Sequence, residues 1–211
     1  MKTRGAFVVF EGCDRCGKST QSKKLVEYLN SKGYDSKYIN FPARNTPSGQ
    51  IINSYLTNKQ DLPDQSIHLL FTLNRWELKE KMQELLEQGT TLIVDRYSYS
   101  GVAFSAAKGL DFDWCKAPEA GLLKPDLVLY MKAPLQELTN RGEYGNERYE
   151  KLEFQNKVVA VYERLYKAEK DYWLQVDATR SIDDTHSYLC NEVVELIKKV
   201  KHSTLSLLWS Q

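Results

Sequence analysis

Residues Gly12 to Ser19 have the G-x-x-x-x-G-K-[ST] spacing of a phosphate-binding loop. Glycines let the backbone N–H groups close around an anion, and the N-terminus of the following helix adds positive potential. Lys18 supplies a mobile positive charge, and the hydroxyl of Ser19 can bind the Mg²⁺ that accompanies a nucleoside triphosphate. The loop therefore predicts binding of a nucleoside triphosphate.

A second group of residues follows the apolar run Leu92-Ile-Val94. Asp95 and Arg96 stand where a buried strand ends, at the edge of the sheet where ligands collect. Asp95 is placed to hold Mg²⁺ or a water bound to it, and Arg96 is placed to contact a second phosphate. The alternative is an ordinary charged strand end.

Two further patterns suggest other chemistries. Cys13 and Cys16 have C-x-x-C spacing, but both lie inside the phosphate loop and no second pair completes a zinc site. Oxidation of a thiol there could block nucleotide entry. Asn58-Lys-Gln-Asp61 fits the guanine-reading N-K-x-D pattern of GTPases, but it follows a polar segment instead of a buried strand. We therefore interpret it as a solvated loop.

The elements that position these groups alternate between strand and helix. Apolar runs at residues 7–10, 91–94, 127–131 and 173–176 predict strands buried on both faces, and residues 34–41 form a weaker, more polar candidate. Helical spacing follows the loop from Ser22, recurs over residues 67–85 and 154–165, and begins again after the capping box Ser181-Ile-Asp-Asp184. This order predicts an α/β fold with a parallel sheet covered by helices on both faces.

Composition narrows the class of protein further. The chain has 211 residues and a formal net charge of +1, which predicts one domain over residues 1–211 and makes extended nucleic acid a poor partner. No apolar run reaches membrane-spanning length, and the N-terminus lacks the apolar stretch of a signal peptide. We expect a soluble cytoplasmic protein without a membrane partner.

Several short segments resemble thymidylate kinases of the eukaryotic type, a family of P-loop nucleoside monophosphate kinases. They occur in the family's order over residues 5 to about 185. They are Asp14-Arg15 within the loop, Phe41-Pro-Ala-Arg44, His68-Leu-Leu-Phe71, Asn74-Arg-Trp-Glu77, Asp95-Arg-Tyr97, Ser100-Gly-Val-Ala-Phe104, Asp113-Trp-Cys115, Lys124-Pro-Asp126 and Arg148-Tyr-Glu150. The resemblance implies a P-loop kinase fold with five parallel strands and a short mobile lid. It also implies a homodimer that makes dTDP from dTMP and ATP with Mg²⁺, in the synthesis of dTTP.

The resemblance also assigns residues to roles. Its catalytic positions are Asp14, Arg15, Lys18 and Arg96, with Arg15 as a built-in counter-charge to the transferring phosphoryl group. Its ATP-binding positions are Gly12, Arg15, Cys16, Gly17, Lys18, Ser19, Thr20, Arg141 of a lid at about 141–150, and Arg180 near adenine. Its dTMP-binding positions are Asp14, Phe41, Arg44, Phe71, Arg75, Arg96, Gly101, Phe104 and Tyr149, and its metal positions are Ser19 and Asp95. An alternative for Asp14 is an anion that only orients Arg15.

The residue types support this chemistry when they are considered separately. Phe71 and Arg75 are four apart and share a helix face, so a ring could stack on a pyrimidine while a guanidinium hydrogen-bonds its carbonyl. Phe71 alone would also suit an apolar core. Arg44 and Arg96 can grip an acceptor phosphate with bidentate hydrogen bonds, although either alone could be a surface charge. A phosphate monoester is largely ionised at neutral pH, so the reaction needs no strong general base.

Two other functions stay open on sequence grounds. A deoxynucleoside kinase also combines a phosphate loop with an acid–arginine pair, but it accepts an uncharged nucleoside and does not need Arg44 and Arg96 around a phosphate. A nucleotide-dependent switch module would hold ATP or GTP without passing a phosphate to a small acceptor.

Overall fold

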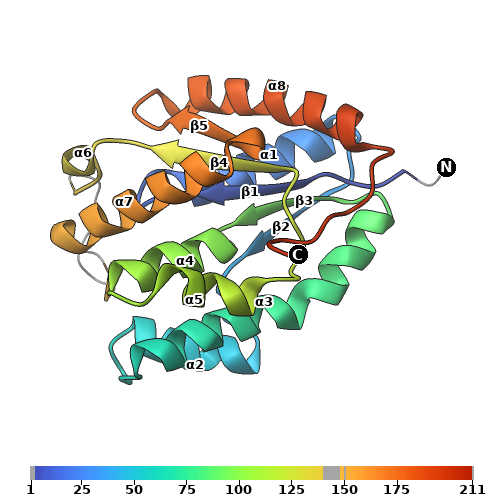
Figure 1. Cartoon of the computed structure of the whole chain (residues 1–211). Helices are drawn as coiled ribbons and strands as arrows, with labels where there is room; N and C mark the ends of the chain where they lie inside the picture. Colours follow the sequence, from blue (N-terminus) through green and yellow to red (C-terminus); the bar gives the residue numbers. More distant parts are fainter. Residues whose placement is uncertain (1–2, 140–147, 150, 211) are drawn as a thin grey trace.

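The architecture is one five-stranded parallel sheet with helices on both faces (Figure 1). The computed structural model describes residues 3–139, 148–149 and 151–210. The strands are β1 (Phe7–Glu11), β2 (Ser36–Asn40), β3 (Thr91–Asp95), β4 (Leu127–Lys132) and β5 (Trp173–Asp177), and they lie in the order β2-β3-β1-β4-β5. The predicted fold class is therefore confirmed. Most of the predicted lid lies outside the described residues, which include only Arg148 and Tyr149 of that segment.

Burial separates the middle of the sheet from its edges. Every residue of β1 and β3 is buried, because these strands have neighbours on both sides and helices on both faces. The prediction of burial on both faces is wrong for β5, where Leu174 is half-buried and Gln175 is exposed. This strand pairs only with β4 and forms an edge of the sheet, where the covering helices shield it less completely.

The helices form two packed groups around this sheet. Helix α1 packs against α8 on one face, and α4 packs against α7 on the other (Figure 1). The helices are α1 (Lys18–Ser31), α2 (Pro47–Leu56), α3 (Asp64–Glu87), α4 (Ser98–Ala107), α5 (Phe112–Lys116), α6 (Leu135–Thr139), α7 (Leu152–Ala168) and α8 (Ile182–Val200), with short 3₁₀ turns η1 (Ala117–Glu119) and η2 (Lys170–Tyr172). No helix within the described ranges is long and apolar enough to cross a membrane.

Local sequence explains where two of these helices begin. Helix α1 starts at Lys18, directly after Gly17, whose φ of 88° lies in the left-handed region that glycine adopts without a steric penalty. Helix α8 begins after Ser181, whose hydroxyl accepts a hydrogen bond from the backbone N–H of Asp184 at 3.0 Å, as the capping box predicts. The first of these starts places the phosphate loop at a helix N-terminus.

The C-terminal segment folds back onto the body of the protein. Leu207 forms an antiparallel bridge with Leu123, and the backbone N–H of Leu208 donates to Leu122 O at 2.6 Å. The side chain of Leu208 is completely buried, and Trp209 Nε1 donates to Glu169 at 2.5 Å. The C-terminal segment therefore packs over Leu122 and Leu123, which follow η1 in the sequence.

Candidate active site

The phosphate loop connects the carboxyl end of β1 to the first turn of α1. Lys18 Nζ donates to the carbonyl oxygen of Cys13 at 2.6 Å and lies 3.5 Å from Cys16 Sγ, so the lysine amine is held over its own loop. Arg15 has a φ of 64°, a left-handed backbone conformation that is uncommon for any residue except glycine. Strain of this kind is concentrated at functional sites, which agrees with the predicted role of the loop.

A hollow beside the loop brings most of the predicted ATP-binding residues together. It is lined by Arg15, Cys16, Gly17 and Thr20 from the loop and α1, and by Arg180 from the segment after β5. The other side of the hollow is the start of α8. Arg141, which was also assigned to ATP, lies outside the described residues.

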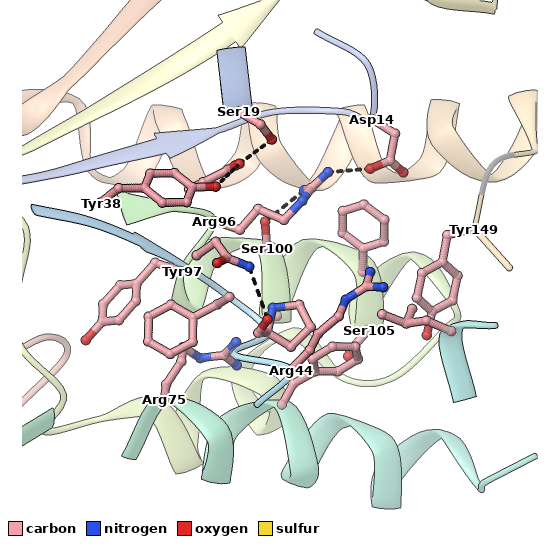
Figure 2. A pocket seen from close by; sticks show the side chains of 18 residues that line it. Asp14, Ser19, Tyr38, Arg44, Arg75, Arg96, Tyr97, Ser100, Ser105 and Tyr149 are labelled. Carbon is pink, nitrogen blue, oxygen red and sulfur yellow. Dashed lines mark hydrogen bonds and ion pairs between the residues drawn. The ribbon is translucent and has the colours of Figure 1, made fainter. Parts of the chain in front are cut away.

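A second pocket lies on the other side of the loop and contains every residue assigned to dTMP. Its lining includes Asp14, Phe41, Arg44, Phe71, Arg75, Arg96, Gly101, Phe104 and Tyr149. Figure 2 shows its labelled side chains converging from the phosphate loop, from the ends of β2 and β3, and from α3 and α4. The sequence therefore identified residues that are far apart along the chain but that line one cavity.

Arg96 lies where the phosphate loop meets this second pocket, which we call the acceptor pocket because its lining contains the residues predicted to bind dTMP. Its Nη2 forms an ion pair with Asp14, and its Nη1 donates to Ser100 Oγ at 3.1 Å (Figure 2). The same Nη1 also donates to Gly12 O at 3.2 Å. Burial works against the charged form, but the carboxylate of Asp14 raises the pKa of Arg96 above its ordinary value. Arg96 also has a left-handed φ, of 66°. The arrangement gives a permanently charged donor at the boundary between the phosphate loop and the second pocket.

A buried carboxylate that the sequence analysis missed supports this arginine. Glu11, at the end of β1, accepts hydrogen bonds from the backbone N–H groups of Tyr97 and Ser100 at 2.9 and 3.1 Å. Its other oxygen accepts from the hydroxyls of Ser100 at 2.6 Å and Tyr162 at 2.8 Å. Burial raises the pKa of Glu11, while these hydrogen bonds and the charge of Arg96 oppose the shift. Glu11 thereby joins β1, the start of α4 and α7.

Glu119 is a second residue that the sequence did not reveal. It is completely buried and forms an ion pair with Arg75, whose Nε donates to Glu119 Oε2 at 2.8 Å. Thr72 Oγ1 donates to Glu119 Oε1 at 2.7 Å. A Cβ placed on Gly101 would lie 2.5 Å from Arg75 Nη2, so only glycine leaves room for this guanidinium. The predicted base-binding arginine is therefore fixed in the pocket wall.

The loop after β2 is held by α3. Asn74 Oδ1 accepts a hydrogen bond from the backbone N–H of Ala43 at 2.7 Å, and Asn74 Nδ2 donates to Ser48 Oγ at 2.9 Å. Arg44, one residue further along, is exposed, and its Nη1 donates to Asn53 Oδ1 at 2.8 Å. The family segments around Phe41 and Asn74 thus act together to present Arg44 at the mouth of the pocket.

The two predicted metal residues lie in contact with each other. Ser19 Oγ donates to Asp95 Oδ2, which also accepts from Tyr38 Oη at 3.3 Å. Asp95 Oδ1 is buried and has no hydrogen-bond partner among the described residues, so one carboxylate oxygen retains its capacity as a ligand. No cluster of three or more His, Cys, Asp or Glu residues able to hold a metal occurs in the described ranges. The donor set fits Mg²⁺ bound by few protein oxygens together with phosphates and water.

Other sequence motifs also have definite places in the structure. Asn58-Lys-Gln-Asp61 is an exposed turn after α2, as predicted, and Asp61 pairs with Arg148 at 2.5 Å. Arg148 Nε also donates to Tyr55 O at 3.0 Å, so this residue lies against the C-terminal end of α2, and its place in a lid over ATP stays a prediction. Cys13 and Cys16 are both buried free thiols, and burial raises the pKa of Cys13 to about 12.

A strand, phosphate loop and helix that face an arginine-lined second pocket define a P-loop nucleoside monophosphate kinase. The family model for thymidylate kinase matches residues 10–189. The chain belongs to the thymidylate kinase family.

Individual relatives agree over nearly the whole chain. The chain is 50% identical over 211 residues to a thymidylate kinase of Arabidopsis thaliana, covering 100% of this chain and 79% of that protein. It is 45% identical to the human thymidylate kinase, covering 98% of each chain. The solved structure of thymidylate kinase from Candida albicans superposes with a TM-score of 0.89 at 38% identity, covering 99% of this chain and 100% of that chain.

Proposed function

We propose that this protein transfers the γ-phosphoryl group of ATP to dTMP and so makes dTDP. The observation that carries the proposal is the shared boundary of the two pockets: Arg96 hydrogen-bonds the phosphate loop at Gly12 O and also lines the acceptor pocket. A donor phosphate held by the loop and an acceptor phosphate beside Arg96 would face one another, which an in-line transfer requires.

The reaction needs positioning and charge neutralisation more than proton abstraction. The attacking oxygen belongs to a phosphate monoester whose second pKa is about 6, so it is already ionised at neutral pH. Lys18 and Arg15 would stabilise the charge that spreads over the transferring group, and Asp14 would hold Arg96 in place. Mg²⁺, when it is bound near Ser19 and Asp95, would neutralise the donor phosphates.

Acceptor recognition would use the two ends of the second pocket. Arg44 and Arg96 would hold the phosphate of dTMP, because guanidinium groups offer paired hydrogen bonds to phosphate oxygens. Phe71 would stack on the base and Arg75 would donate to its carbonyl. Phe104 packs against Tyr149 with ring centroids 5.4 Å apart, a contact that would narrow the space for a ribose 2′-hydroxyl.

An ADP-release assay tests the assignment directly. We expect ADP release that depends on dTMP, and no comparable stimulation by thymidine. Stimulation by thymidine instead of dTMP would identify a deoxynucleoside kinase. Equal release with and without dTMP would identify a nucleotide-dependent module and overturn the proposal.

We also infer a homodimer. Leu69, Leu73 and Trp76 lie along one face of α3 with residue exposures of 46%, 49% and 37%, a pattern typical of a helix that meets a partner. Light scattering on the purified protein should give twice the mass of one chain, and Leu73→Glu should reduce it to that of one chain. A Leu73→Glu protein with unchanged mass would exclude this face as the interface. We infer as well that residues 1–211 form a single domain and that the protein works in the cytoplasm.

A further inference from the structure

A hydrogen-bonded chain of three residues runs behind the base end of the acceptor pocket. His68 on α3 is completely buried, and its Nδ1 lies 2.8 Å from Ser105 Oγ on α4. Its Nε2 lies 3.0 Å from the carbonyl oxygen of Cys115 on α5. Ser105 and Arg75 both line the pocket (Figure 2), and Phe71 and Gly101 line it beside them. None of the roles assigned above uses His68 or Ser105.

The partners of the ring determine which nitrogen carries the proton. A carbonyl oxygen can only accept a hydrogen bond, so Nε2 must carry the hydrogen that lies between it and Cys115 O. In a neutral imidazole the other nitrogen is then a bare acceptor. Ser105 must therefore donate its hydroxyl hydrogen to Nδ1.

The surroundings of His68 favour this neutral ring. Burial lowers the pKa of His68 below its usual value. Glu119 raises this pKa and Arg75 lowers it, and these two groups form an ion pair with each other. Hydrogen bonds to the backbone of Cys115 and Gly101 also raise the pKa but do not outweigh burial. The ring therefore stays uncharged at neutral pH, and Nδ1 remains an acceptor.

We propose that His68 is a positioning residue that fixes Ser105 as a hydrogen-bond acceptor in the base pocket. With its only hydrogen committed to His68, the Ser105 hydroxyl presents lone pairs and no donor to a bound base. Arg75 presents the opposite polarity, because guanidinium can only donate. Its Nε and Nη2 both bind Glu119, so a bound base would receive its hydrogen bond from Nη1.

The donor on Arg75 and the acceptor on Ser105 are complementary to the hydrogen-bonding edge of only one kind of pyrimidine base. A base with a carbonyl oxygen beside a ring N–H, as in thymine, offers an acceptor to Arg75 and a donor to Ser105. Cytosine offers the reverse, with an amino donor beside a bare ring nitrogen. A mismatched base would leave buried polar groups unpaired, which discriminates more strongly than a missing apolar contact. The inference rests on the proposed function and adds how its base selectivity is set.

The test compares the dissociation constants of dTMP and dCMP by competition binding, with kcat/KM for dTMP alongside. Ser105→Ala removes the acceptor, so the preference for dTMP over dCMP should fall about tenfold, the equivalent of one hydrogen bond. His68→Phe leaves the Ser105 hydroxyl free to rotate and donate to cytosine, so the preference should fall by at least as much. His68→Gln offers an amide oxygen and an amide nitrogen in place of the ring nitrogens, and the preference should largely return.

A double mutant separates positioning from simple damage. If His68 acts through Ser105, His68→Phe should cause no further loss of preference when Ser105 is already alanine. A structural defect would instead weaken dTMP and dCMP binding equally and leave their ratio unchanged, which would overturn the inference. If His68→Phe does not fold, the other two variants carry the test: an unchanged preference in Ser105→Ala, or a preference in His68→Gln no better than that of Ser105→Ala, would overturn the inference. Failure of the wild-type protein to phosphorylate dTMP would count against the proposed function, whereas an unchanged ratio in an active enzyme would count only against His68.

Discussion

The guanidinium of Arg75 and the carboxylate of Glu119 face each other inside the protein, with side-chain exposures of 3% and 0%. Arg75 comes from the long helix α3 and Glu119 from the short turn η1, and Gly101 of α4 closes the contact from a third side. Removing one partner of a buried ion pair leaves an uncompensated charge, which costs more than the pair itself contributes. The base end of the acceptor pocket thus depends on Glu119, a residue absent from the pocket lining.

Glu119→Ala should therefore destabilise the protein and weaken dTMP binding together. We expect the free energy of unfolding to fall by about 3–5 kcal/mol and KM for dTMP to rise, because Arg75 loses the partner that orients it. Denaturant unfolding and steady-state kinetics measure the two effects. The matched control is Glu84→Ala, which removes an exposed ion pair with Lys81 (side-chain exposures 59% and 65%). The control should change stability by less than about 1 kcal/mol, and equal losses in the two variants would contradict the argument.

Gly101→Ala adds a single methyl group to the face of α4 that contacts Arg75. That carbon would lie 2.5 Å from Arg75 Nη2 and 3.2 Å from Glu119 Oε1, so the guanidinium must shift. We expect KM for dTMP to rise about tenfold or more, because misplacing a binding group by about 1 Å is costly. KM for ATP should stay the same. A variant with normal KM for dTMP would show that Arg75 does not read the acceptor.

Arg15→Ala removes the positive charge placed inside the phosphate loop. We expect kcat to fall on the order of 10³-fold, because an arginine that neutralises the transferring phosphoryl group acts mainly in the transition state. Thermal unfolding should remain close to that of the wild type. Arg164→Ala, which removes an exposed arginine packed on Phe112 with 3.6 Å between its Cζ and the ring centroid, is the control and should leave kcat unchanged. A near-normal rate for Arg15→Ala would remove it from the catalytic residues.

Cys13 should react slowly despite its C-x-x-C spacing. Burial is the main cause that raises the pKa of this thiol to about 12, and neighbouring Cys16 raises it further. The thiolate is the reactive form, so alkylation of Cys13 in the folded protein should be far slower at pH 8 than in the unfolded chain and should accelerate as the pH rises toward 12. Mass spectrometry after timed iodoacetamide treatment measures this. Rapid labelling or a Cys13–Cys16 disulfide at pH 8 would support the redox alternative instead.

The sequence allowed good prediction of several elements that carry a strong local pattern. The phosphate loop, the interior strands and the cap at Ser181 carry their signals within a few residues. Helix α4 was missed because nearly all of its surface is buried, so it has no polar face to produce a helical repeat. Glu119 and Ser105 were missed for another reason: their partners lie 44 and 37 residues away in the chain. Only the folded arrangement brings such groups together.

The left-handed backbone at Arg15 and Arg96 has an evolutionary consequence. Chain geometry alone would favour glycine at both positions, since a side chain there is strained. The proposed phosphoryl transfer would require a long cationic side chain at the same two places. In a library with every amino acid at these two positions, the variants that accumulate most protein should differ from the variants with the highest kcat. Natural selection would therefore remove glycine substitutions that relieve the backbone strain, because they would lower the rate of the reaction.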